Sequence, residues 1–151
     1  MLVHEINAIY YDVKKKKSII YSESEIVSNE KPIVILETLC HRYGLSCLGS
    51  FTAIKECLNI HQKCPVLVHP LLQIYFFPTC SYKDDDCVWI NSKQIKQIKS
   101  KDVYTEIVFN NGFTLLCKVG IRSIKKQCKR CELMEQHILK QYQIDQLSLK
   151  L

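Results

Sequence analysis

Short apolar runs separated by polar turns cover most of the first 120 residues, and this pattern predicts strands. Residues 5–13 and 18–27 are rich in Ile, Tyr and Val, and four consecutive lysines, residues 14–17, separate them. Because four adjacent like charges cannot be buried together, these lysines indicate a solvated turn between two strands. We therefore expect an N-terminal hairpin over residues 5–27.

Residues 32–43 have a different period and predict a helix. Their apolar side chains recur at steps of three and four residues, as on one face of a helix. Pro32 is tolerated in the first helical turn, and Gly44 is placed to end the helix. The next stretch, GLSCLGSF from Gly44 to Phe51, contains two glycines and two serines. It is the most loop-like part of the chain.

Four further strands are predicted before residue 92. They cover residues 52–60, 65–68, 72–77 and 87–91. The following segment, SKQIKQIKSK at residues 92–101, carries Lys and Ile at three-residue spacing. We interpret it as one tight turn that brings its lysines together.

A hairpin and a long helix complete the chain. DVYTEIVF and FTLLCKV flank Asn110-Asn111-Gly112, and Asn-Gly supplies the positive φ values that a two-residue type I′ turn needs. After Gly120 the apolar period changes to three and four residues, which predicts an amphipathic helix over residues 121–142. The last residues, QLSLKL, are expected to be a frayed tail.

These elements predict an α+β fold. We expect a mainly antiparallel sheet or a small barrel, with one helix near 32–43 and a basic amphipathic helix near 121–142. The chain is expected to form a single domain over residues 1–151, with its strands between the two helices at residues 52–119.

Charge is concentrated in one part of the chain. The protein has 21 Lys and Arg against 15 Asp and Glu, a net charge of +6. Between Val88 and Cys131, ten basic residues accompany two acids, a net of +8, while the remainder carries −2. A basic block of this kind is typical of a polyanion binder. The alternative interpretation is a solvated, lysine-rich surface.

Sequence motifs give no support for catalysis or for a bound metal. The chain lacks G-x-S-x-G, a glycine-rich phosphate loop and H-E-x-x-H, so we expect neither an enzyme nor a cofactor. Cys128 and Cys131 form a C-x-x-C pair, but only His137 follows, whereas a zinc site normally needs four ligands. A thiol or metal sensor that uses these two cysteines remains an alternative hypothesis.

No apolar stretch approaches the ~20 residues of a membrane span, and the N-terminus lacks a signal peptide's features. We therefore expect a cytoplasmic protein without a membrane partner. The nine cysteines are then expected to be reduced thiols.

Four sequence blocks together resemble the ComK family, the competence transcription factors of low-GC Gram-positive bacteria. The blocks are CHRYGLSCLG, KCPVLVHPLLQIYFFPT, CVWIN and EIVFNNGFTLL. The resemblance runs from about Glu5 to Gln127, and the segment from Pro65 to Thr79 is its most specific part. Each block alone is weak, so the order and spacing of all four carry the match.

The resemblance implies a nucleoid-associated DNA-binding activator of the genes for DNA uptake and recombination. Members bind double-stranded DNA at paired A/T-rich boxes, engage the minor groove, and work as dimers or dimers of dimers. RNA polymerase and a proteolytic adaptor are further partners that the resemblance implies.

The expected DNA contacts fall into three groups. Phosphate contacts come from the segment after the third block and from the C-terminal helix, and the small-residue loop approaches the groove of the DNA. The residues are Lys93, Lys96, Lys99 and Lys101 in the first group, Arg122, Lys125, Lys126, Lys129 and Arg130 in the second, and Arg42, Gly44 and Gly49 in the third.

The chain departs from the family pattern in one loop and in length. Members tend to carry a basic pair after the position of Gly49, where this chain has Ser50 and Phe51, and longer members extend further at the C-terminus. These departures favour an alternative hypothesis, a divergent or shortened family member that binds DNA weakly and associates with a full-length relative.

Overall fold

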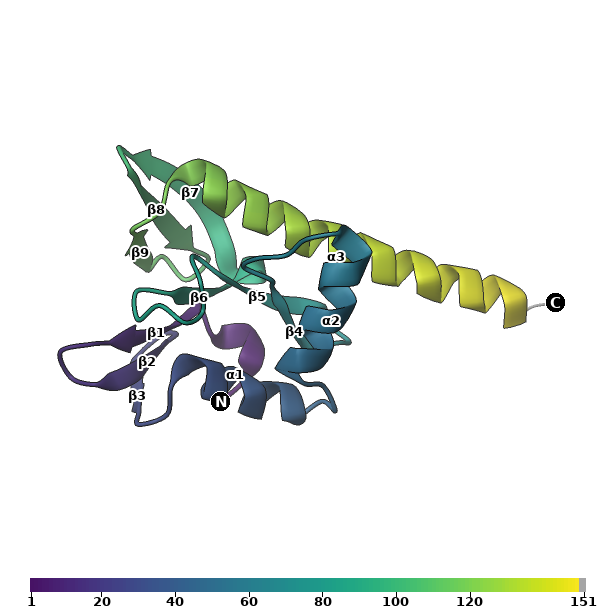
Figure 1. Ribbon diagram of the computed structural model, residues 1–151, viewed down its shortest axis with the longest axis horizontal. Coiled ribbons are helices and arrows are strands. Elements are labelled where there is room, and N and C mark those ends of the chain that lie inside the picture. Colours follow the sequence, from purple (N-terminus) through teal and green to yellow (C-terminus); the bar gives the residue numbers. More distant parts are fainter. Residues whose placement is uncertain (150–151) are drawn as a thin grey trace.

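The computed structural model describes residues 1–149, whose strands form two antiparallel sheets (Figure 1). The larger sheet has the order β3-β2-β1-β6-β5-β4 and the smaller one the order β7-β8-β9. The strands of the larger sheet are β1 (Ala8–Asp12), β2 (Lys17–Tyr21), β3 (Glu25–Ser28), β4 (Val66–His69), β5 (Ile74–Pro78) and β6 (Val88–Asn91). Those of the smaller sheet are β7 (Ile95–Lys101), β8 (Tyr104–Phe109) and β9 (Thr114–Cys117).

Three α-helices accompany the sheets: α1 (Pro32–His41), α2 (Cys47–Leu58) and α3 (Ile121–Leu149). The α+β prediction with an antiparallel sheet is confirmed, and within the described residues neither sheet closes into a barrel. The predicted helix at 32–43 is α1, which ends at His41.

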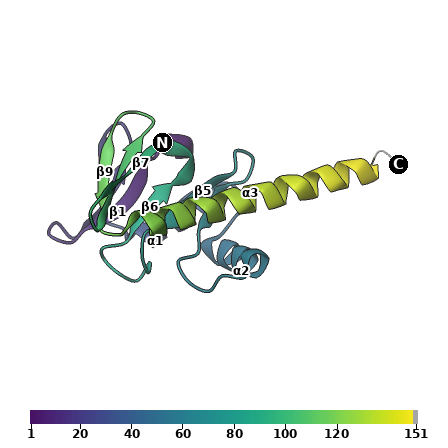
Figure 2. The ribbon, with the colours of Figure 1, turned by 90° about the horizontal axis from the view of Figure 1, so that it is seen from above.

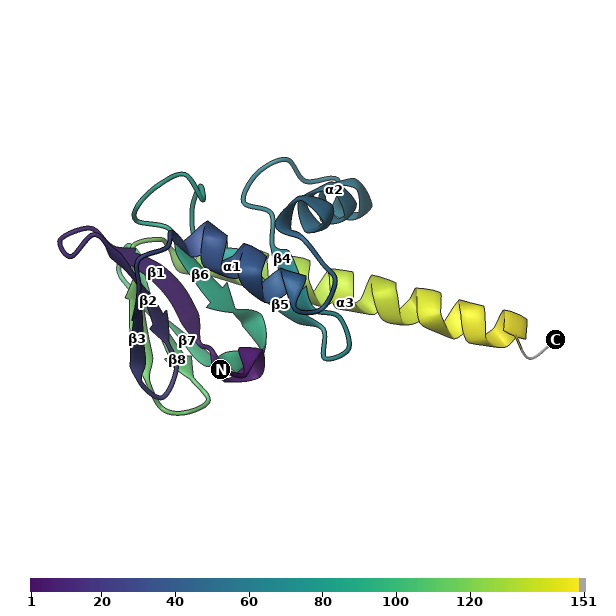
Figure 3. The same ribbon diagram turned by 90° about the horizontal axis from the view of Figure 1, so that it is seen from below.

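The larger sheet is buried on both faces near its centre. All five residues of β5 are buried, which explains why its sequence is a continuous apolar run. Phe76 lies in one core cluster, together with Leu36 and Leu39 of α1. Phe77 lies in a second cluster, together with Phe109 of β8 and residues of α3. Figure 3 shows α1 lying across the larger sheet.

The predicted strand at 52–60 is wrong, because residues 52–58 belong to α2. Ser46 caps this helix, its hydroxyl accepting a hydrogen bond from the Gly49 N–H at 3.0 Å, and Asn59 ends it in the left-handed conformation at φ 51°. The predicted loop from Gly44 to Phe51 is therefore shortened, since helix begins at Cys47. The strand region 52–119 of the predicted domain layout accordingly begins with a helix.

The segment at 92–101 is a short 3-10 turn, Ser92–Gln94, followed by β7. The predicted tight turn is therefore wrong for most of this segment, and the lysines after Lys93 follow a strand. The hairpin between β8 and β9 is confirmed. The Phe109 N–H donates to the Phe113 carbonyl oxygen, so the loop between this pair has three residues, Asn110–Gly112, of which only Gly112 has a positive φ, 89°. This is a three-residue hairpin loop with Gly in the left-handed position rather than a type I′ turn.

Helix α3 is longer than predicted and extends beyond the rest of the protein (Figure 2). It continues through the expected tail to Leu149, and every residue from Leu139 to Leu149 is exposed. Within residues 1–149, no helix is long and apolar enough to cross a membrane.

Candidate nucleic-acid interface

The N-terminal half of α3 presents one buried face and one basic face. Ile124, Cys131 and Met134 face the core, and the 3.6-residue period turns the opposite face of the helix outward. The outward basic residues are Arg122, Lys125, Lys126 and Lys129, all exposed. Lys129 also lies 3.8 Å from Glu132, one turn further along, so the first three have the least compensated charge.

Two side chains of α3 fix the segment between α2 and β4 against the helix. Gln127 is 3% exposed, and its Nε2 donates hydrogen bonds to the carbonyl oxygens of Lys63 at 2.8 Å and Pro78 at 2.7 Å. Arg130 donates to the carbonyl oxygen of Gln62 at 3.0 Å and to Oε1 of Gln127 at 3.1 Å. Arg130, predicted as a phosphate contact, therefore also holds this segment in place.

The fixed segment brings further basic residues beside α3. Three adjoining concavities share lining residues in this region, from α2 across the segment at 59–64 to α3. We call this surface the α2–α3 groove and define it by Lys55, His61, Lys63, Lys126, Lys129 and Arg130. None of the residues that line the three concavities is acidic. A concave basic surface without acids focuses positive potential.

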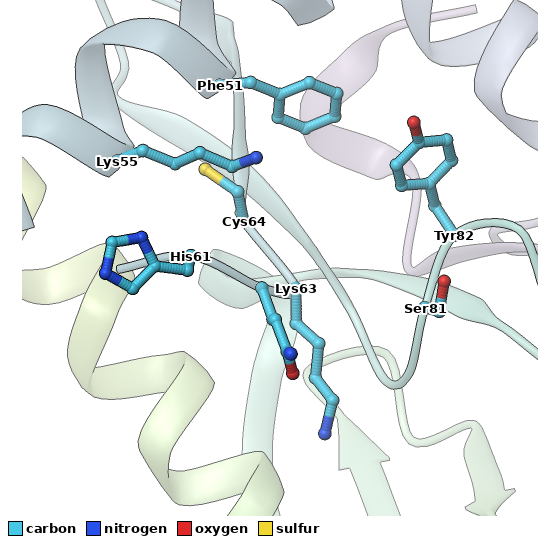
Figure 4. Close-up of a pocket in the computed structure, with 8 residues that line it drawn as sticks. Phe51, Lys55, His61, Lys63, Cys64, Ser81 and Tyr82 are labelled. Carbon is cyan, nitrogen blue, oxygen red and sulfur yellow. The ribbon is translucent and has the colours of Figure 1, made fainter. Parts of the chain in front are cut away.

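Figure 4 shows one end of the groove, a cavity of about 390 Å³. Phe51 and Tyr82 face each other at its mouth, with the Lys55 amine close by. Burial raises the pKa of the Cys64 thiol at this end to about 11, so that the thiol is neutral at pH 7.

The lysines of β7 lie apart from this groove. Lys99 pairs across the strands with Glu106, and Lys101 pairs with Tyr104. The opposite side of the sheet buries Ile107, so alternation places both lysines on the outward face. Lys96 lies at a bulge in the same strand. The three are therefore spread along a strand, and one of them has a carboxylate neighbour.

Lys93 is the member of this group that reaches α3. Its Nζ lies 2.5 Å from Oε2 of Glu135, so its charge is largely compensated. The predicted lysine cluster at 93–101 is therefore not formed as a single patch.

The third predicted group, around the small-residue loop, is engaged within the protein. Arg42 donates a hydrogen bond to the carbonyl oxygen of Met1 at 2.8 Å. Gly44 has a φ of 75°, a conformation that favours glycine, and Gly49 lies in the first turn of α2. Both glycines line an apolar cavity of about 250 Å³ beside α3.

Ser50 and Phe51, which stand where the resemblance implies a basic pair, have side chains that pack inward. Ser50 is buried, and its hydroxyl accepts a hydrogen bond from the Leu67 N–H at 3.0 Å. Phe51 is partly buried against both core clusters. These two positions therefore present no cation at the protein surface.

Cys128 and Cys131 belong to the packed side of α3. Cys131 is 3% exposed, and burial raises the pKa of the Cys128 thiol to about 11. Within the described residues, no group of three or more His, Cys, Asp or Glu side chains is arranged to hold a metal ion.

Sequence reasoning missed Lys55, His61 and Lys63. The strand prediction at 52–60 concealed that Lys55 lies on a helix beside α3. The polar run His61-Gln62-Lys63 before Pro65 was the available signal for an exposed segment. Its contact with α3 depends on hydrogen bonds between residues far apart in the sequence, such as the one between Gln127 and Lys63, which are 64 residues apart.

Comparisons with known proteins agree with the sequence blocks described above. The family model of the ComK protein matches residues 6–143. A competence transcription factor of Bacillus subtilis (strain 168) is 32% identical over 120 residues, which cover 79% of this chain and 62% of that protein. The chain thus spans less than two thirds of that relative's length. No solved structure matches the chain.

Proposed function

The chain belongs to the ComK family, and we propose from this that it regulates transcription of competence genes by binding double-stranded DNA. The observation that carries the proposal is the acid-free α2–α3 groove, where cations from two helices and the segment between them converge. Lysines in such a surface neutralise phosphates and release counterions, which supplies much of the affinity for DNA.

We propose that the groove and the neighbouring basic face of α3 follow the phosphate backbone together. Lys126 belongs to both surfaces, and Arg122 and Lys125 extend the cationic track toward the start of α3. Since Lys93 is paired with Glu135 and Lys99 lies opposite Glu106, these two lysines contribute less. Arg42, Gly44 and Gly49 are proposed to form a second approach to the DNA, between the end of α1 and the first turn of α2.

The preferred DNA is proposed to be A/T-rich and bound largely through the minor groove. A-tracts have a narrow minor groove whose negative potential attracts Arg and Lys, and the exposed Arg122 and Lys125 have the chemistry for this role.

RNA polymerase and a proteolytic adaptor are proposed as further partners, with the cytoplasm as the site of action.

Binding to a fluorescent duplex with two A/T boxes, compared with a GC-rich duplex over a salt series, tests this function. We expect tighter binding to the A/T duplex and a slope of log K against log salt of about −0.9 for each phosphate contact. Equal binding to both duplexes would contradict the sequence preference, and no binding at low salt would contradict the function.

A second proposed function is association with another copy of this chain or of its family, through the exposed end of α3. Leu139, Tyr142, Ile144 and Leu147 are exposed there, and residues 139–149 contain only two charged residues. An isolated helix of this length is marginal in water, so a packing partner would stabilise it.

The apolar cavity beside α3 supports a second copy as the occupant. Met134 and Ile138 line this cavity, and Tyr142 continues their face of the helix one turn further on. Two copies related by a two-fold axis would each place the end of α3 against the other's cavity. The exposed apolar stripe and the cavity would then be buried in one interface.

A further inference from the structure

The cavity at the end of the α2–α3 groove has a composition that duplex binding does not require. It is lined by Phe51 and Lys55 of α2, residues of the segment at 61–64, and Ser81 and Tyr82 of the segment between β5 and β6. Its volume of about 390 Å³ lies within the ~300–1,000 Å³ of small-molecule sites. Figure 4 shows the two aromatic rings and the Lys55 amine around this space.

The aromatic rings of Phe51 and Tyr82 stack on each other. The ring centroids of Phe51 and Tyr82 are 5.8 Å apart, with an interplanar angle of 21°. Tyr82 is 46% exposed, so a substantial part of its ring remains available to a planar partner. Aromatic side chains of this kind bind nucleobases through their π-faces, with little dependence on base identity.

Positive charge lies beside the rings. The Lys55 Nζ is 5.7 Å from the centroid of Phe51, and His61 and Lys63 line the same cavity. Among residues 1–149, neither Lys55 nor Lys63 forms an ion pair. The cavity therefore combines a stacking surface with two free ammonium groups and no carboxylate, which is the chemistry that recognises an aromatic base carrying a phosphate.

We propose that this cavity binds a single nucleotide, with the base against Phe51 and Tyr82 and the phosphate near Lys55 and Lys63. The nucleotide is either a free mononucleotide or an unpaired nucleotide of a DNA strand, because both present the same base and phosphate. This site goes beyond duplex recognition, since its aromatic rings contact a base face that stacking on neighbouring bases covers in a duplex.

Equilibrium dialysis with dAMP and fluorescence anisotropy with a labelled single-stranded dA hexamer test the proposal on the full chain. Tyr82→Ala should weaken binding about five-fold to about one hundred-fold, the usual loss for one stacked base. Lys55→Gln should weaken it as well. Tyr104→Ala, which removes an exposed tyrosine from β8, is the matched control and should leave binding unchanged.

The two probes distinguish the sources of the nucleotide. Binding of dAMP supports a free nucleotide as the ligand, whereas binding of the hexamer alone supports a nucleotide within a strand. Failure of both probes to bind, or equal losses in Tyr82→Ala and Tyr104→Ala, would overturn the proposal. Binding of the A/T duplex by the wild-type chain is measured in parallel, so that failure of the nucleotide site alone is separable from failure of the proposed function.

Discussion

Glu37 shows how a single side chain joins two helices. Its Oε2 accepts a hydrogen bond from the Cys47 N–H, the first residue of α2, at 2.9 Å. Its Oε1 lies 2.8 Å from Nε2 of His41, one turn further along α1. A carboxylate at a helix N-terminus satisfies an otherwise unpaired N–H and interacts favourably with the helix dipole. Glu37 therefore helps to position α2, which contributes Lys55 to the groove.

Replacing Glu37 with Gln should destabilise the protein by about 1 kcal/mol, as expected for loss of a charged capping interaction. Hydrogen bonds from the thiol and the backbone N–H of Cys47 lower the pKa of the Glu37 carboxyl from 4.5. A lowered folded pKa contributes stability above pH 4.5 that is lost as pH falls through the folded value. Urea unfolding of both proteins between pH 7 and pH 3 measures this, and their stabilities should converge in acid. A constant difference across this range would contradict the assignment.

The cysteines should differ sharply in reactivity, because the thiolate is the reactive species. Burial raises the pKa of Cys87 and Cys117 to about 12, whereas Cys57 is exposed and lies 3.6 Å from Nε2 of His137. Brief treatment with iodoacetamide at pH 8, followed by peptide mass spectrometry, should find modification first at Cys57. Equally rapid modification of Cys128 or Cys131 would contradict this order and would favour the sensor hypothesis.

At the scale of elements, the sequence predicts α1, both hairpins and α3, because their periods are regular. It fails at β7, where Ile95 and Ile98 are three residues apart yet lie on the same face. The bulge at Lys96 adds one residue between them, and this shifts the two-residue alternation by one. The three-residue period therefore resembled a tight turn.

Helix α2 was missed for a related reason. Its side chains are mostly exposed, and Ile54 is its one fully buried large residue, so a short apolar pattern fits a strand as well as a helix. Tertiary contacts at the start of the helix, such as the one between Glu37 and Cys47, determine the outcome. These contacts lie ten residues apart and leave no local periodic signal.

The exposed end of α3 should mediate self-association. In sedimentation velocity, we expect the wild-type chain to dimerise with increasing concentration and Tyr142→Lys to remain monomeric, because a buried ammonium without a partner is costly. Gln143→Lys adds the same charge at the neighbouring exposed position and is the control, expected to dimerise normally. A wild-type chain that stays monomeric at high concentration would contradict this interface.

At the scale of the whole molecule, the fold presents a basic groove and a projecting helix. The sequence located the α3 half of the groove through its charge pattern. The other half requires the fold, because Gln127 and Arg130 hold the segment at 59–64, with Lys63, against α3. Helix α2, which carries Lys55, packs beside α3. The same fold disperses the β7 lysines that the sequence grouped together.

The central claim is that DNA binds in the α2–α3 groove, and matched charge variants test it most directly. The groove variant is Lys55→Gln/Lys63→Gln/Lys126→Gln. The control, Lys14→Gln/Lys15→Gln/Lys16→Gln, removes the same charge from the exposed β1–β2 turn. Binding of the A/T duplex is measured for both over a salt series.

We predict that the groove variant binds more weakly. Its salt slope should be shallower by about three phosphate contacts, one for each lysine, whereas the control keeps the wild-type slope. Equal losses in the two variants would show that net charge alone governs binding and would contradict the claim.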